Sequence, residues 1–370
     1  GNLMAVYIAN YADCMLLLFN GDEQDYDKYI HHLAQRAAMF DKGSKNTPWY
    51  RLCKAGLYMQ WAFVHVRMGE NLKAATNFRK SYMLLKENKK LYPSFEYNDI
   101  FFGLEEAVVG TVPDDYKWIA SVFGLKGDVK KGIAKINRFV AGHTVADPLY
   151  YDALIYQAYL RFYLVSQQEQ VWQLVNSNVF PAQNNLLFSF VKANIAINYR
   201  KADAALETIT HMRTLPGYKY IPAFEYEYGS ALYYKADAAC VPVLQGFVQS
   251  YKGRLFVKDA LHKIAHIYYL RGDMPAAKRY RAMISTEGNT QVDADKRAKR
   301  FAETTEWPAA ELLKATMLID GGYYNEAMRQ LQQYSEASFA SISDKAAYNL
   351  RLGRAYDETG QDDKAIQCYA

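Results

Sequence analysis

YNLRLGRAYDETGQDDKAIQCYA, residues 348–370, is the stretch whose residue spacing decides the fold. Two pairs of apolar residues stand four positions apart in it: Leu352 with Tyr356, and Ala365 with Tyr369. Because residues four apart lie on one face of a helix, each pair predicts a helix with one apolar face. Gly360 and the aspartates after it stand between the pairs, where one helix should end and another should start. The stretch therefore predicts two helices joined by a tight turn, the second beginning near Asp362.

Gly353 falls in the middle of the first of these helices, where glycine is unfavourable. A glycine inside a helix costs roughly 1 kcal/mol relative to alanine. We therefore expect a neighbouring helix to come close to Gly353, most simply at Ala365 across the turn.

The same residues resemble the tetratricopeptide repeat family. The positions that match its leucine, glycine, tyrosine, turn glycine, alanine and final aromatic residue are Leu352, Gly353, Tyr356, Gly360, Ala365 and Tyr369. Asn349 stands where the family has its opening tryptophan, which departs from the pattern. The resemblance implies an all-α solenoid: a right-handed superhelix of antiparallel helical hairpins whose concave face holds a partner peptide or protein.

Further copies of the turn glycine, with an alanine five residues later, occur along the chain. The clear copies are Gly69 with Ala74, Gly272 with Ala277, and Gly322 with Ala327. Fainter copies surround Gly127 and Ala205. The copies are spaced irregularly, so we expect degenerate repeats with extended helices or insertions. The middle of the chain is also similar to repeat proteins of gut anaerobic bacteria, a likeness that implies no particular chemistry.

The chain is expected to form one continuous helical array in two parts. In 370 residues we expect roughly twenty helices, or about ten hairpins, and no strand region. Residues 1–92 are predicted to form N-terminal hairpins that include one repeat-like unit. Residues 93–370 are predicted to form the remaining array, continuous with the first part in one solenoid. Pro93 and Pro113 flank a short apolar helix that marks a seam, and hairpins should run from Trp118 onward.

The composition argues for a folded chain with no nucleic-acid partner. Hydrophobic residues make up 51% of the chain and only 10 prolines occur, which excludes a disordered protein. A net charge of +5 is too small to indicate nucleic-acid binding. The densest basic run, residues 293–303, also contains aspartates and a glutamate, so we interpret it as a solvated helix face.

The cysteines and histidines do not predict a metal site. The four cysteines are far apart and form no C-x-x-C pair, so we expect small buried thiols. His262 and His266 stand one helical turn apart, as two ligands of one metal would, but no third ligand stands nearby. We therefore interpret them as ordinary polar histidines and predict neither a metal nor another cofactor.

The ends of the chain leave its location open. The longest apolar run near the start is brief, so no transmembrane segment is expected. Gly1 is interpreted as the remnant of a cleaved expression tag, so a native leader could have been removed. A cytoplasmic or a cell-envelope location is therefore compatible with the sequence. The last helix would stop at Ala370 without a polar cap, so we expect native sequence or a partner to cover that end.

The resemblance also selects candidate partner-binding residues, because positions beside the small residue of each first helix should face the concave side. These residues are Tyr159, Phe162, Phe190, Asn194, Tyr226, Ser230, Tyr233, His262, His266, Tyr269, Arg354 and Asp357. The predicted groove is aromatic and mildly polar, and 32 tyrosines supply more rings than helix stacking needs. Any single ring in such a stripe can equally belong to the core.

Two functions of different classes fit this pattern. The sequence contains no phosphate-binding loop, dinucleotide fingerprint, zinc-protease motif or nucleophile elbow. We therefore favour a non-enzymatic scaffold that binds a protein or peptide, with no catalytic residue. The alternative is an α/α-toroid enzyme that acts on carbohydrate, a lyase or a glycosidase, since such barrels also consist of helical hairpins. Neither hypothesis predicts an oligomeric state.

Overall fold

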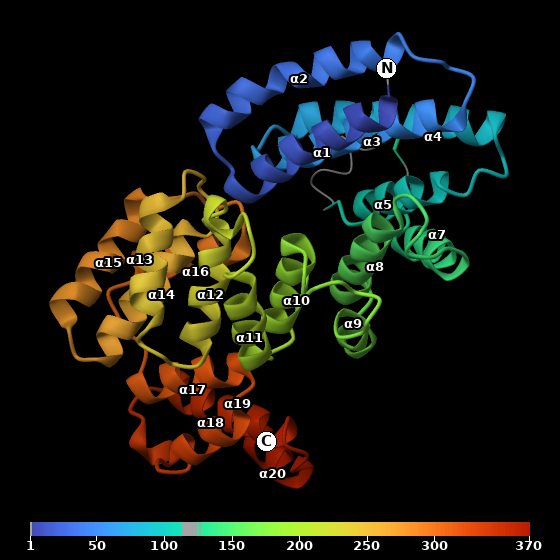
Figure 1. Cartoon of the computed structure of the whole chain (residues 1–370). Helices are drawn as coiled ribbons and strands as arrows, with labels where there is room; N and C mark the ends of the chain where they lie inside the picture. The colour runs from blue at the N-terminus through green and yellow to red at the C-terminus, as the bar shows by residue number, and fades with distance from the viewer. Residues whose placement is uncertain (1, 113–123, 126) are drawn as a thin grey trace. The chain divides into compact units, whose positions relative to one another are not determined.

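A computed structural model describes residues 2–112, 124–125 and 127–370 of the chain (Figure 1). Within these residues the chain forms 19 α-helices and no β-strand. The helices pack in neighbouring pairs along the sequence. The predicted all-α class of paired helices is therefore confirmed, whereas the right-handed superhelix stays a prediction.

The chain divides into two compact units, Gly1–Phe180 and Pro181–Ala370, which we call unit 1 and unit 2. The helices of unit 1 are α1 (Leu3–Asn20), α2 (Glu23–Asp41), α3 (Pro48–Arg67), α4 (Asn71–Leu91), α5 (Asn98–Gly110), α7 (Val129–Gly142), α8 (Tyr150–Leu164) and α9 (Gln168–Val175). The division that the sequence suggested after residue 92 falls inside unit 1, where α4 and α5 contact each other.

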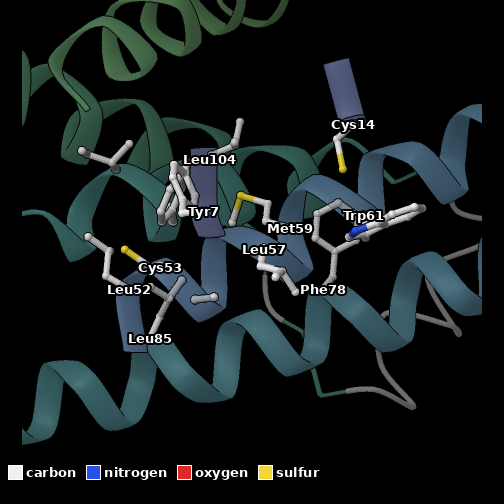
Figure 2. Close-up of a cluster of buried hydrophobic side chains, with 14 of the residues drawn as sticks. Tyr7, Cys14, Leu52, Cys53, Leu57, Met59, Trp61, Phe78, Leu85 and Leu104 are labelled. Atoms are coloured by element: carbon white, nitrogen blue, oxygen red, sulfur yellow. The ribbon is translucent and has the colours of Figure 1, made fainter. Parts of the chain in front are cut away.

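The centre of unit 1 is α3, which α1, α2 and α4 all contact. Its sequence is apolar on almost every side, which is the pattern of a helix buried all round. Leu57 and Trp61 of α3 are fully buried. Figure 2 shows them among side chains from α1 and α4, including Tyr7, Phe78 and Leu85. The core of unit 1 is therefore built around one helix.

Among the residues that the structure describes, α1 is the one helix long and apolar enough to span a membrane. Length and composition alone are weak support for a span, because core helices pass the same test. In unit 1, α1 packs on α3 and buries Asn10 completely. Trp61 donates from Nε1 to Asn10 Oδ1 over 2.8 Å, and Asn10 donates from Nδ2 to Gln60 Oε1 over 2.6 Å. These hydrogen bonds tie α1 to the central helix.

The seam that the sequence predicted corresponds to α5, the short apolar helix that follows Pro93. This helix packs closely on α7 at two glycines: a Cβ added to Gly103 would lie 2.6 Å from the carbonyl oxygen of Gly132. Because that atom belongs to the backbone, the two helices can approach only where no side chain intervenes. The predicted Pro113 and Trp118 lie outside the described residues.

Unit 2 consists of five helix pairs and one inserted helix. Its helices are α10 (Leu186–Asn198), α11 (Ala202–Met212), α12 (Ala223–Tyr234), α13 (Cys240–Ser250), α14 (Val257–Leu270), α15 (Met274–Thr286), α16 (Asp293–Glu303), α17 (Ala310–Gly321), α18 (Tyr324–Leu331), α19 (Ile342–Asp357) and α20 (Asp362–Tyr369), with short 3₁₀ turns at Tyr218–Tyr220 and Glu336–Ser338. The inserted helix α16 packs on α14 and α15. The predicted start of the last helix near Asp362 is confirmed.

The turn glycines of the four clear copies all follow helix ends, whereas Gly127 of a fainter copy has no positive φ angle. Gly69, Gly272, Gly322 and Gly360 have positive φ angles, the left-handed region that glycine adopts without strain. The alanines five residues after them, Ala74, Ala277, Ala327 and Ala365, are buried. Two turns of the same kind lack glycine: Arg200 follows α10 and Ala236 follows α12, with φ angles of 56° and 57°.

Gly353 lies at a close helix approach, as predicted, but its neighbours differ from the expected one. A Cβ added to Gly353 would lie 2.5 Å from Cε1 of Tyr369 and 3.0 Å from Cβ of Cys368. In an antiparallel pair, residues at similar distances from the turn lie level with each other. Gly353 precedes Gly360 by seven positions, so residues seven to nine positions after it, rather than Ala365, come level.

Within unit 2 the chain turns back, so that residues at the ends of α17 and α19 contact the turn inside the α10–α11 pair and the end of α12 (Figure 1). Tyr323 donates from its hydroxyl to Asp203 Oδ1 of α11 over 2.6 Å. Arg200, in the turn after α10, forms an ion pair with Glu358, just after α19. Helix α17 accordingly contacts α12 as well as α14. The last two pairs therefore do not simply continue the stack of the first three.

Candidate functional site

A row of polar side chains crosses the first helix of every pair in unit 2. Its members are Asn194 of α10, Glu227 and Tyr234 of α12, Lys263 of α14, Asp320 of α17 and Arg354 of α19. We call these six residues the polar row. All of them are buried or half-buried, and each interacts with a neighbour in the row. The row therefore links helices that are far apart in the sequence.

At the α10 end of the row, Asn194 donates from Nδ2 to Glu227 Oε1 over 3.0 Å. Burial raises the pKa of the Glu227 carboxyl, and the hydrogen bond from Asn194 partly lowers it. Gly229, two residues further on, lets α13 approach closely, since a Cβ there would lie 2.5 Å from Cδ2 of Leu244. Tight packing of α12 on α13 thus fixes the position of Glu227.

Lys263 occupies the middle of the row, on α14. Its Nζ donates to Oδ2 of Asp259, one turn earlier, and the hydroxyl of Tyr226 donates to the same oxygen over 2.7 Å. Nζ also lies 5.2 Å from the ring centre of Tyr226, 5.6 Å from that of Tyr233 and 5.8 Å from that of Tyr234. Burial lowers the pKa of the Lys263 amine to about 7. Three aromatic rings and one carboxylate thus surround the lysine.

Asp295 of α16 holds the start of α14 beneath this lysine. Its Oδ2 accepts a hydrogen bond from the backbone N–H of Phe256 over 2.7 Å, and its Oδ1 accepts one from the backbone N–H of Asp259 over 3.0 Å. These N–H groups have no partner within their own helix, so a carboxylate from a neighbouring helix satisfies them. Burial raises the pKa of Asp295 to about 6. The inserted helix α16 therefore positions α14.

Two histidines on α14 pack together beside the row. The ring centres of His262 and His266 lie 4.0 Å apart, and both rings contact Phe301 of α16. Nδ1 of His266 is 2.8 Å from the hydroxyl of Tyr233. Burial lowers the pKa of His262 to about 3 and lowers that of His266 well below its usual value. Both rings are therefore neutral at pH 7.

The histidines do not belong to a metal-binding cluster. In the part of the chain that the structure describes, no group of three or more histidine, cysteine, aspartate or glutamate side chains is placed to hold a metal ion.

The far end of the row, on α17 and α19, is rich in arginine. Arg354 Nη1 lies 3.5 Å from Asp320 Oδ1. Arg351, one turn earlier on α19, donates from Nε to Thr316 Oγ1 of α17. Burial raises the pKa of Asp320, and Arg354, Arg200 and Arg351 partly lower it. This end of the row therefore places three guanidinium groups near one half-buried carboxylate.

The structure places the twelve sequence-predicted residues in both units. Tyr159 and Phe162 belong to α8 of unit 1, and the other ten belong to unit 2. The buried ones are Phe162, Tyr226, Ser230, Tyr233 and His266; the half-buried ones are Tyr159, Phe190, Asn194, His262, Tyr269 and Arg354; and Asp357 is exposed. The side chains of Tyr226, Tyr233, His262 and His266 come together around Lys263 or beside it. A role for any of the twelve in binding stays a prediction.

Only Asn194 and Arg354 of these residues belong to the polar row. On α12 and α14 the prediction chose Tyr233 and His262, whereas the row contains the next residue of each helix. One position turns a helix by about 100°, so the neighbouring residue faces a different direction. The sequence contains no distinct signal for Lys263, because α14 also contains the charged residues Lys258 and Asp259.

A hollow of about 780 Å³ lies elsewhere on unit 2, between the end of α14 and the α17–α18 pair. Its lining includes the cations Arg271, Lys314 and Arg329 together with the carboxylates Glu311 and Glu326. Because both signs of charge are present, the lining favours no single class of ligand.

A comparison with protein-family models finds no match to the chain, and a comparison with curated proteins finds no significant similarity.

Proposed function

We propose that the chain is a non-enzymatic scaffold that binds a peptide or protein segment across the first helices of unit 2. The observation that supports this most strongly is the polar row, which crosses all five pairs on their first helices. The resemblance to tetratricopeptide repeats implies a partner-binding face on the same helices. A row that spans five pairs can contact an extended partner at several points.

The row combines fixed anchors with groups that remain accessible. Lys263 and Glu227 are buried and held by neighbours, so they give the row a defined geometry. Tyr234, Asp320 and Arg354 are only half-buried, so a bound segment can reach them. Tyrosine and arginine are the residue types that contribute most to protein interfaces. The accessible part of the row therefore has the composition of a binding surface.

A selection of displayed peptides against the purified full chain tests this proposal. The enriched peptides are labelled, and their affinities are measured by fluorescence anisotropy. We expect Arg354→Glu and Tyr234→Phe to weaken binding, the charge reversal by about tenfold. Lys278→Glu, an exposed lysine on the second helix α15, is the matched control and should leave the affinity unchanged. Equal binding by the Arg354→Glu variant and the wild type would remove the basis of the proposal.

A further inference from the structure

A trough on unit 1 lies above α3, between α2 and α4. One part of it, a hollow of about 380 Å³, is lined by residues of α2, α3 and α4 that include Ile30, Leu33 and Leu72. A second hollow of about 480 Å³ lies between α3 and α4. Thr76 and Lys80 of α4 line both hollows, so the two adjoin along this helix. We call the two hollows together the α4 trough.

The lining of the α4 trough is apolar and positively charged. Leu72 and Met83 on α4 are 61% and 52% exposed, which is unusual for large apolar side chains that share one helix face. The cations of the lining are Lys54, Lys73, Arg79 and Lys80. Among the described residues that line the two hollows there is no aspartate or glutamate.

The cations of the lining differ in how far their charge is offset. Lys73 pairs with Glu70, and Lys54, which is only 9% exposed, pairs with Asp41. The Nζ of Lys80 lies 5.2 Å from the ring centre of Tyr58 on the floor of the trough, a contact that leaves the ammonium charged. The trough therefore presents positive charge beside apolar surface.

We propose that the α4 trough binds an acidic amphipathic helix of a partner protein. The lining residues of α4 run from Leu72 to Leu84, which corresponds to about 18 Å or three helical turns. A helix of that length can place apolar residues against Leu72 and Met83 and carboxylates against the flanking lysines. The trough is bounded by helices, and the described part of unit 1 has no strand edge to which an extended peptide could add.

This surface is separate from the polar row, because all of its residues belong to unit 1. Binding at the α4 trough therefore neither requires nor excludes binding at the row. The proposal for the trough and the proposal for the row can therefore fail independently.

A helical peptide library with fixed leucine and glutamate positions tests the proposal. The library is selected against the purified full chain, and enriched peptides are compared with two matched probes: one with lysine in place of every glutamate, and one with the same residues scrambled. We expect the acidic helix to bind, to lose affinity as salt is added, and to bind at least about tenfold more tightly than either matched probe.

Variants of the chain then locate the binding surface. The double variant Lys73→Glu with Lys80→Glu should lower the affinity for the acidic helix by about tenfold or more, and Leu72→Glu should also lower it. Lys80→Arg should bind the helix as the wild type does. Lys90→Glu and Leu91→Glu make the same changes at the exposed end of α4, outside the trough, and should have no effect. All of these positions are exposed, so thermal unfolding should be nearly unchanged.

Four results with peptides or with the chain alone would overturn the proposal. The library could yield no acidic helix, or the lysine probe could bind as tightly as the acidic helix. The variants outside the trough could lose as much affinity as those inside it. Finally, the chain could form a dimer that Lys80→Glu abolishes. The last outcome would assign the trough to a second copy of this chain. Binding of vesicles of anionic lipid in place of the helix would assign it to a membrane surface and would also overturn the proposal.

Discussion

Arg354 of α19 lies 3.5 Å from Asp320 of α17, and the two side chains are still 34% and 39% exposed. The ion pair joins the first helices of the last two pairs in unit 2, at the arginine-rich end of the polar row. An exposed pair of this kind contributes at most about 1 kcal/mol to folding. Under the proposed function, its main effect is on the binding of a partner.

The Asp320–Arg354 pair gives a first prediction. Arg354→Glu should change the free energy of unfolding by less than about 1 kcal/mol but weaken peptide binding about tenfold. The swapped variant, Asp320→Arg with Arg354→Glu, re-forms the pair but brings the new arginine near Arg200 and Arg351, so it should recover neither binding nor all of the stability. Urea unfolding and fluorescence anisotropy measure the two effects. Full recovery of binding in the swapped variant would show that the pair acts only on the fold.

The buried pair between Lys263 and Asp259 gives a second prediction. At pH 6, below the Lys263 pKa of about 7, Lys263→Met should lower the free energy of unfolding by about 3 to 5 kcal/mol, because it leaves the Asp259 carboxylate buried without its cation. Adding Asp259→Asn should restore more than half of the loss, since the uncompensated charge is then gone while Tyr226 keeps an acceptor. Chemical denaturation of Lys263→Met, Asp259→Asn and the double variant measures the coupling between the two residues. Losses that simply add would contradict a buried ion pair.

The turn glycines give a third prediction. A Cβ at Gly272 would meet no atom within 4 Å, so only its φ angle of 77° opposes a side chain. Gly272→Ala should therefore destabilise the chain by about 1 kcal/mol. Gly246, inside α13, is also in open space but has no positive φ angle, so Gly246→Ala should stabilise by up to about 1 kcal/mol. Thermal unfolding of both variants should give shifts of opposite sign.

The histidines of α14 give a fourth prediction, on pH. The pKa of His262 is about 3 in the folded chain, so the unfolded chain takes up a proton below about pH 6.5 while the folded chain does not. Stability contributed by the neutral ring is therefore present above pH 6.5 and is lost as the pH falls toward 3, by at most about 1.4 kcal/mol per pH unit.

A comparison of variants isolates that effect, because Asp295 acts in the opposite direction. Its pKa of about 6 means that protonation favours the folded chain between pH 6 and the usual value for aspartate, about 3.8. His262→Phe removes only the histidine contribution. An aromatic ring fits there, because the ring centre of His262 already lies 4.5 Å from that of Phe301. Urea unfolding at pH 7 and pH 5 should show a smaller loss in His262→Phe than in the wild type. Equal losses would show that His262 is charged in the folded chain.

Local signals allowed much of the fold to be predicted from the sequence. The turn glycines and the alanines five residues later depend on one turn and one helix contact, so they can be recognised within a short stretch. Of the turns without glycine, the one at Arg200 was indicated only by the buried Ala205 five residues later. The one at Ala236 escaped, because nothing in its residue type indicates a positive φ angle. The neighbour of Gly353 was misplaced because we chose the alanine of the repeat pattern. The residues in contact are those that lie as far after the turn as Gly353 lies before it.

The polar row could be predicted only in part, because it depends on which helices meet. Arg200 and Glu358 stand 158 positions apart, and no local pattern shows that the turn after α10 contacts the end of α19. Asn194 and Arg354 were selected by spacing alone. Lys263 was missed because the spacing rule selected His262, His266 and Tyr269 on the same helix. Asp320 was missed because the rule selected no residue of α17.

Site-specific photo-crosslinking in native cells tests the central claim most directly. A photoreactive amino acid is placed at Tyr234 or Arg354 in the polar row, and at Lys278 on the second helix α15 as the control. We expect both row positions to crosslink to one and the same partner and the control position not to do so. Crosslinking of that partner from Lys278 as strongly as from the row, or no crosslink from either row position, would contradict it.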